Sequence, residues 1–245
     1  MIILEFMRLT TVPLSSKFLG ELDRLTDDLI RVFHTKGGAA GRKIRAVMAK
    51  TDNSADINVR RDCVLSCLSI YLNEDLDTLV KEYVAAEDLR QSVKPKPDVK
   101  RSKASLDTVQ SLLSPRKSLH LKETRNLTLR GGLTYEHDIE CGEAEADVAG
   151  TTMAIYTVRA ESDDPDGPGG RFADVGVVLE GVEVLHNLQS INHACVMLYG
   201  LIYALNLSYP KSLKNTFEVY QKILMDLESS KLSPKVQALK LKLLR

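Results

Sequence analysis

The sequence has no tryptophan, and aromatic residues make up only 5% of it. Proteins that bind single strands of nucleic acid stack the bases on aromatic side chains, so this composition disfavours such a surface. A long apolar run is missing as well, because the most apolar window, residues 194–205, is about half the roughly 20 residues that a membrane span requires. The apolar run at the start of the sequence is too short for a signal peptide. We therefore expect a cytoplasmic or nuclear protein with no membrane partner.

Cysteine is scarce, and its four residues have irregular spacings, which predicts free thiols and not a disulfide framework. Cys63 and Cys67 lie one helical turn apart, but no second pair follows nearby to complete a zinc site. His193 and Cys195 point about 200° apart on one helix, so they cannot pair as base and nucleophile. A looser metal-binding set, distant in sequence, stays open as an alternative: His137, Cys141, His186 and His193. We predict no catalytic residue, no metal ligand and no cofactor.

Glycines at positions 37, 38 and 41 are followed by Arg42 and Lys43, which superficially suggests a phosphate-binding loop. Such a loop needs Gly-Lys-Ser/Thr after four intervening residues and a strand before it. This segment lacks that spacing and follows a helical pattern. We therefore interpret it as a turn between two helices.

The formal net charge is zero, but the charges are unevenly distributed. Between Lys94 and Arg130 ten basic residues stand against three acidic ones, a net charge of +7. Residues 131–170 hold ten acidic residues and one basic residue, a net charge of −9. Neither stretch has the apolar content to offset the cost of ordering its backbone. We expect residues 91–147 to form a flexible, disordered linker that is first basic and then acidic.

Three features of this linker are candidates for function. Ser114 precedes a proline and two basic residues, which is typical of a proline-directed phosphorylation site in accessible backbone. A weak apolar repeat indicates a nascent helix that orders on contact with another surface, and it consists of Leu106, Val109, Leu112 and Leu113. The candidate basic contact residues are Lys94, Lys96, Lys100, Arg101, Lys103, Arg116 and Lys117.

The N-terminal part, residues 1–90, has the pattern of a four-helix module. An apolar stripe with helical spacing predicts a first helix that Ser15 or Ser16 caps: Phe18, Leu22, Leu25, Leu29 and Phe33. Two shorter amphipathic helices follow. We expect a fourth helix after Asn73, with one apolar side formed by Leu76, Leu79, Val80, Tyr83 and Val84.

The C-terminal part, residues 148–245, predicts a small α+β module of two or three strands and three helices. Residues 153–158 and 175–179 are rich in β-branched residues and predict strands, with a third candidate after Gly181. Ser190 caps the next predicted helix, and Ser233 with Pro234 begins the last one. The complete chain is therefore expected to be α+β and mainly helical, with two modules on a charged linker.

The helix between those two carries what we call the C-terminal seam, five apolar residues with four-three-four-three spacing: Leu213, Phe217, Tyr220, Leu224 and Leu227. The seam needs a partner surface. It either packs on the helix that contains Cys195 or forms a short coiled coil with a partner helix. We favour packing on the helix that contains Cys195, within the module's own core, because two heptads are short for an independent coiled coil.

Parts of the sequence resemble a large group of uncharacterised fish proteins, commonly labelled similar to a sterile-alpha-motif-domain-containing protein. The resemblance lies in Ile155-Tyr-Thr-Val158, in residues 174–185 and 193–210, and in Arg60-Arg-Asp-Cys63. It covers most of the chain outside the linker. No segment resembles the sterile alpha motif itself, and the resemblance implies no reaction and no catalytic residue.

Function is therefore predicted from architecture. We expect a non-enzymatic intracellular protein that binds other proteins, similar to an adaptor or scaffold. The alternative is a protein that associates with nucleic acid without reading its sequence, through the basic residues between Lys94 and Arg130 and those of residues 42–50. An enzyme of unknown class is the third possibility, because the histidines and cysteines are not yet placed.

Overall fold

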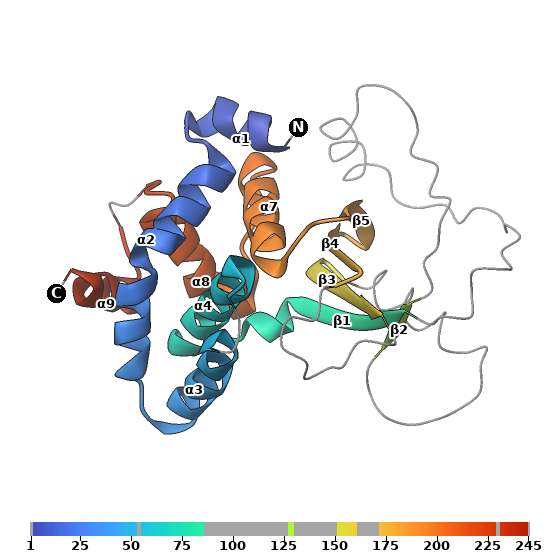
Figure 1. Ribbon diagram of the computed structural model, residues 1–245. Coiled ribbons are helices and arrows are strands. Elements are labelled where there is room, and N and C mark those ends of the chain that lie inside the picture. Colours follow the sequence, from blue (N-terminus) through green and yellow to red (C-terminus); the bar gives the residue numbers. More distant parts are fainter. Residues whose placement is uncertain are drawn as a thin grey trace, which may run out of the picture.

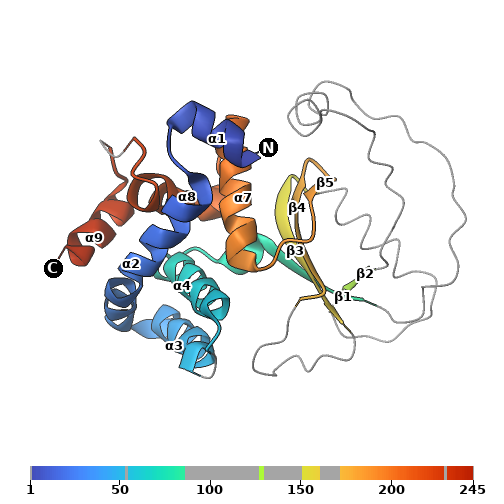
Figure 2. The same cartoon turned by 45° about the horizontal axis from the view of Figure 1, so that its top comes forward.

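The computed structural model describes residues 2–52, 55–85, 127–129, 151–160, 172–228 and 231–244. The fold is α+β, as predicted. A layer of helices lies beside a five-stranded sheet, and the described helices all lie on one side of that sheet (Figure 1; Figure 2).

The N-terminal part forms four α-helices: α1 Ile2–Thr10, α2 Leu14–His34, α3 Gly38–Asp52 and α4 Ile57–Tyr71. Helix α2 buries its predicted apolar stripe, but its N-cap is Pro13, so the prediction of a serine cap is wrong. Gly38 has a φ of 67°, which glycine adopts at little cost, and the chain turns there into α3. Helix α1 was not predicted.

The expected fourth helix is also wrong. Its residues form a 3-10 turn, η1 Leu76–Thr78, and then the strand β1 Val80–Ala85. Short apolar runs fit both a helical and a strand period, and Val80, Tyr83 and Val84 are residue types that favour strands. Pairing with a strand more than 70 positions away decides the outcome, and a local pattern carries no information about that pairing.

The sheet has the order β2-β1-β3-β4-β5. Its other strands are β2 Leu127–Leu129, β3 Met153–Ala160, β4 Asp174–Leu179 and β5 Val182–Leu185. Strands β1 and β3 are parallel, whereas the other neighbours are antiparallel. The last three strands confirm the predicted ones. Strand β2 lies inside the predicted linker, so the linker prediction is wrong at these three residues, and its other residues lie outside the described part.

The C-terminal helices are α7 Ile191–Ala204, η3 Lys211–Leu213, α8 Lys214–Val219, η4 Tyr220–Leu224 and α9 Pro234–Leu243. Ser190 caps α7 as predicted, because its side chain accepts a hydrogen bond from the backbone N–H of His193 at 3.3 Å. The single helix expected to carry the C-terminal seam is a 3-10 turn, a short α-helix and the π-helical η4 in succession.

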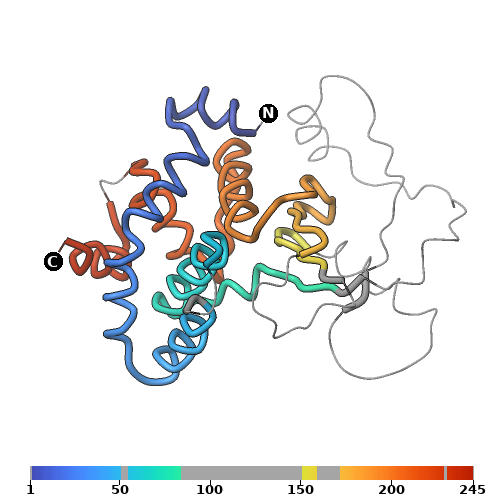
Figure 3. The backbone as a smooth tube through the Cα atoms, in the orientation of Figure 1, coloured from blue at the N-terminus to red at the C-terminus, as the bar shows by residue number. Residues whose placement is uncertain are grey.

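Most of the apolar interior forms one hydrophobic core. It joins side chains of α1, α2 and α4 to side chains of β3, β4, α7, α8 and α9. Figure 3 shows the N-terminal helices, in blue, lying among the orange and red C-terminal ones. We expected each end of the chain to close its own core, and that expectation is wrong because contacts between distant segments are invisible to periodicity. Among the described residues, no helix is long and apolar enough to cross a membrane.

Candidate functional site

The C-terminal seam lies in the shared core. Leu213, Phe217, Tyr220 and Leu224 are at most 1% exposed, and Leu227 packs against the core while partly buried. The ring of Tyr220 lies 5.0 Å from Phe18 of α2 and 6.5 Å from Tyr199 of α7, measured between centroids. The seam is therefore covered by the chain's own helices.

The other candidates of the sequence lie outside the described residues. These are Ser114 and the seven basic contact residues of the linker. Their roles stay predictions.

The described cysteines are buried thiols. Cys63, Cys67 and Cys195 are at most 6% exposed. Burial raises the pKa of the Cys67 thiol to about 12, and it also raises the pKa of Cys195 well above its ordinary range. A thiol with a raised pKa is a poor nucleophile, because the thiolate is the reactive form. Burial lowers the pKa of His193. Within the described ranges, no group of three or more His, Cys, Asp or Glu side chains could hold a metal ion.

Helix α1 carries the densest exposed apolar surface among the described residues. Its Ile2 and Phe6 are buried, and Phe6 packs on Tyr199 and Tyr203 of α7 with centroids 5.8 and 5.1 Å away. The remaining apolar residues face outward: Ile3 is 38% exposed, Leu4 70%, Met7 47% and Leu9 46%. We call these four residues the α1 patch.

The α1 patch holds half of the exposed large apolar side chains that the described part contains. The others are Ile57, Leu207 and, three positions apart at the C-terminal end of α9, Leu241 and Leu244. Single exposed apolar residues are ordinary, whereas a cluster of them marks an interaction surface. The ion pair of the same helix, Glu5 with Arg8 at 2.6 Å, gives it no net charge.

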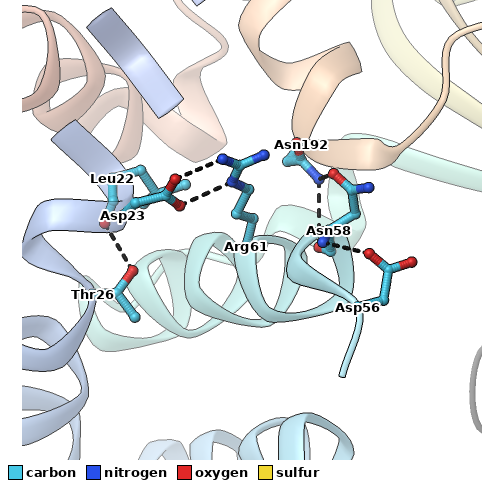
Figure 4. A network of polar contacts seen from close by, with 7 residues as sticks. All are labelled: Leu22, Asp23, Thr26, Asp56, Asn58, Arg61 and Asn192. Carbon is cyan, nitrogen blue, oxygen red and sulfur yellow. Dashed lines mark hydrogen bonds and ion pairs between the residues drawn. The ribbon is translucent and has the colours of Figure 1, made fainter. Parts of the chain in front are cut away.

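A polar junction connects the helices α2, α4 and α7 (Figure 4). Arg61 of α4 binds Asp23 of α2 through two hydrogen bonds of 2.9 and 2.6 Å. Beside it, Asp62 accepts hydrogen bonds from the backbone N–H and the side-chain amide of Asn192, at 2.7 and 2.9 Å. Asn192 lies in the first turn of α7, where free N–H groups and the helix dipole favour a carboxylate.

Burial of Asp62 nevertheless raises its pKa to about 6. The hydrogen bonds from Asn192 act in the opposite direction, because they stabilise the charged form, but the loss of solvation outweighs them. Neighbouring Arg61 also favours the charged form. Asp62 thus connects α4 to α7 while carrying a partly desolvated charge at neutral pH.

A second carboxylate holds the start of α8. The side chain of Glu74, in the loop after α4, accepts four hydrogen bonds of 2.7 to 2.9 Å from the backbone and side chains of Asn215 and Thr216. These donors include two of the free N–H groups of the first helical turn. The contact fixes the beginning of the seam against the N-terminal helices.

The outer face of α3 is basic. Arg42, Lys43, Arg45 and Lys50 are all exposed on this helix. Lys43 lies 3.3 Å from the carboxylate of Asp75. The face could contact phosphate groups through charge alone.

A cleft of about 250 Å³ lies between α2, η4 and α9. Four basic and three acidic side chains line it together with four leucine or isoleucine side chains. Some charges already have partners within the chain, such as Arg24, which binds Glu21. The mixed charges favour no ion of one sign, so the α1 patch is the better candidate for a functional surface.

Neither the family comparison nor the searches of curated proteins and solved structures found a match. The resemblance to the fish proteins therefore stays a prediction. The reasoning from sequence missed the α1 patch, although a signal was present. Six of the nine residues from Ile2 to Thr10 are apolar, and in a helix they lie on more than one side. An excess of apolar residues around a helix surface leaves some of them without a partner.

Proposed function

We propose that this protein is a non-enzymatic, intracellular interaction protein, adaptor-like or scaffold-like, and that it docks partner proteins through the α1 patch. The observation that carries the proposal is the concentration of exposed Ile3, Leu4, Met7 and Leu9 on one helix. Buried thiols with raised pKa values and a mixed-charge cleft support a role in binding over a role in catalysis.

The charge of α1 favours a protein partner over a membrane surface. Helices that lie on membranes carry many lysines and arginines, which attract anionic lipids. Helix α1 has one arginine, and Glu5 neutralises it. An apolar patch without net charge suits the apolar face of a protein partner.

The test compares two variants that place glutamate at exposed apolar sites. Leu4→Glu with Met7→Glu disrupts the α1 patch, whereas Ile57→Glu changes an isolated residue that is 52% exposed. Tagged chains are used to capture proteins from cell extract, and the bound proteins are quantified. We expect the α1 double variant to lose specific partners that wild type and Ile57→Glu retain.

Thermal melting checks that all three chains are folded. The proposal is wrong if folded wild type and the folded α1 variant capture the same partners in the same amounts. Binding of wild type to neutral or anionic vesicles, lost in the α1 variant, would also contradict it.

The basic face of α3 favours association with nucleic acid as a second candidate function. Its four exposed basic residues would contribute to affinity by releasing counterions from phosphates, so binding would weaken steeply with salt. Retention on mixed-sequence RNA and DNA at rising salt tests it. We expect Arg42→Glu with Arg45→Glu to reduce the salt slope if this function is correct, and equal retention of both chains would refute a role for α3.

A further inference from the structure

Three tyrosines lie near one another at the end of α7 and in the loop that follows it. Tyr199 and Tyr203 belong to α7, with ring centroids 6.3 Å apart, and Tyr209 lies in the loop. Tyr199 is buried, whereas Tyr203 and Tyr209 are half-buried. The hydroxyl of Tyr209 donates a hydrogen bond to Oε1 of Gln221 at 2.8 Å. Nε2 of Gln221 in turn donates to Oε2 of Glu228 at 3.0 Å.

The carboxylate of Glu228 acts on all three tyrosines. Burial, and then the charge of Glu228, raise the pKa of Tyr209 to about 12. Burial also raises the pKa values of Tyr199 and Tyr203, and the charge of Glu228 adds to both. A negative charge has this effect because it disfavours the formation of a phenolate nearby. We call Tyr199, Tyr203, Tyr209, Gln221 and Glu228 the tyrosine site.

Two groups of the tyrosine site lack a complement. Glu228 is exposed, and within the described part of the chain no lysine or arginine pairs with it, so the neutral amide of Gln221 leaves its charge uncompensated. The buried hydroxyl of Tyr199 has no hydrogen-bond partner among the described residues. A buried hydroxyl without a partner is rare in folded proteins, and a bound water or ion is one ordinary reason for it.

An ammonium group fits this combination. Aromatic rings and a carboxylate both attract it, and its N–H groups donate hydrogen bonds to hydroxyl and carboxylate oxygens. A phosphate or carboxylate ligand would be repelled by Glu228. A quaternary ammonium ion has no N–H group, so it would offer Tyr199 no hydrogen bond.

The position of the site favours a lysine of a protein over a free amine. Phe6 of α1 packs on Tyr203 with centroids 5.1 Å apart, so the tyrosine site borders the helix that carries the α1 patch. Leu207, between Tyr203 and Tyr209 in the sequence, adds an apolar side chain that is 37% exposed. A protein that docks on the α1 patch is therefore close enough to place a lysine in the tyrosine site.

We propose that the tyrosine site binds the ammonium group of a lysine side chain from a protein partner, with the carboxylate of Glu228 as its counter-charge. The choice of a partner's lysine rests on the proposed function, whereas the affinity of the site for an ammonium group does not. The partner that this surface selects carries a lysine beside an apolar segment.

Titration of the full-length, isotope-labelled chain with a blocked lysine, N-acetyl-lysine methylamide, tests the site by nuclear magnetic resonance. N-acetyl-norleucine methylamide is the matched ligand, because it keeps an aliphatic side chain and lacks the ammonium group. We expect the blocked lysine to shift the backbone amide signals of Tyr203, Tyr209, Gln221 and Glu228. The norleucine compound should leave these signals unchanged.

Glu228→Gln removes the counter-charge and keeps an acceptor for Gln221. It should weaken binding of the blocked lysine about tenfold, because hydrogen bonds to charged groups contribute more than neutral ones. Glu180→Gln is the control, since Glu180 is also exposed and has a φ of 51°, against 52° for Glu228. This control variant should bind the blocked lysine with the affinity of wild type.

Several results would overturn the proposal. They are equal shifts with the norleucine compound, shifts confined to other residues, and equal affinity of wild type and Glu228→Gln. Binding of butylammonium without binding of the blocked lysine would assign the site to a free amine and would overturn it as well. The α1 variant Leu4→Glu with Met7→Glu should still bind the blocked lysine, so a failure of the α1 patch and a failure of the tyrosine site are measured separately.

Discussion

The C-terminal seam and the α1 patch are both apolar surfaces of helices, yet they have opposite environments. Phe217 and Tyr220 of the seam are at most 1% exposed, whereas Leu4 and Met7 of the patch are 70% and 47% exposed. Several helices of the chain cover the seam, since Tyr220 packs on Phe18 of α2 and on Tyr199 of α7. Helix α1 is apolar on several sides, and α7 can cover only the side that holds Phe6.

The difference shows that apolar content alone does not locate a binding surface. What matters is whether the apolar residues exceed what the fold can cover. In the seam they do not, and its side chains stabilise the fold. In α1 the apolar residues exceed what the described residues cover, and the excess is exposed.

The largest expected effect follows from the seam. Phe217→Ala removes a buried ring that lies 5.2 Å from Tyr220 and 5.4 Å from Tyr209, between centroids. It should lower the free energy of unfolding by roughly 3 to 5 kcal/mol. Met7→Ala, a matched truncation in the α1 patch, should change it by less than about 0.5 kcal/mol. Urea unfolding of both variants measures the contrast, and similar losses would remove the distinction between the two surfaces.

The second effect concerns Asp62, whose pKa in the folded protein is about 6. Because this is above the unfolded value of about 4, the native state binds the proton more tightly. The stability contributed by the protonated form is complete below pH 4 and is lost as pH rises through 6. The loss amounts to at most about 3 kcal/mol, and partial exposure reduces it.

Asp62→Asn isolates this contribution, since an amide oxygen still accepts the bond from Asn192 but carries no charge. We expect the variant to be more stable than wild type at pH 7 and to lose that advantage at pH 4. Urea unfolding of both proteins from pH 4 to pH 7 gives the difference in their free energies of unfolding as a function of pH. A variant that is less stable at pH 7, or a flat difference curve, would show that the charge itself is needed at the junction.

A smaller effect is expected at the start of the seam. Glu74→Ala leaves donors of Asn215 and Thr216 without their acceptor, which should cost about 1 to 3 kcal/mol. Asp27→Ala is the control, because the exposed ion pair of Asp27 with Arg60 at 2.8 Å should contribute no more than about 1 kcal/mol. Equal melting temperatures of the two variants would mean that Glu74 does not hold α8 in place.

Much of the fold was predictable because local signals were strong. The regular stripe of α2, the cap Ser190 and the Ser233-Pro234 pair define three helices correctly. Strands β3 and β4 are rich in β-branched residues, and their positions followed from composition. The inward direction of the seam followed from its spacing.

The misses at β1 and at the two carboxylate contacts have a common cause, since each depends on residues distant in sequence. Strand β1 was taken for a helix because its pairing with β3 is not encoded locally. The bonds of Asp62 with Asn192 and of Glu74 with Thr216 span 130 and 142 positions, so no motif predicts them. Together with the shared apolar core, these contacts join the two ends of the chain. The apolar pattern of each end alone could not predict that.

Oxidation of Met7 tests most directly that the α1 patch is exposed in the free protein and covered in the complex. Peroxide converts accessible methionine to sulfoxide, and mass spectrometry follows each site. In the purified protein Met7, 47% exposed, should oxidise faster than Met225, 1% exposed. With the captured partner bound, Met7 should become protected while half-buried Met48 keeps its rate. Equal oxidation of Met7 in the free and bound protein, with the partner shown to be present, would contradict the proposed docking surface.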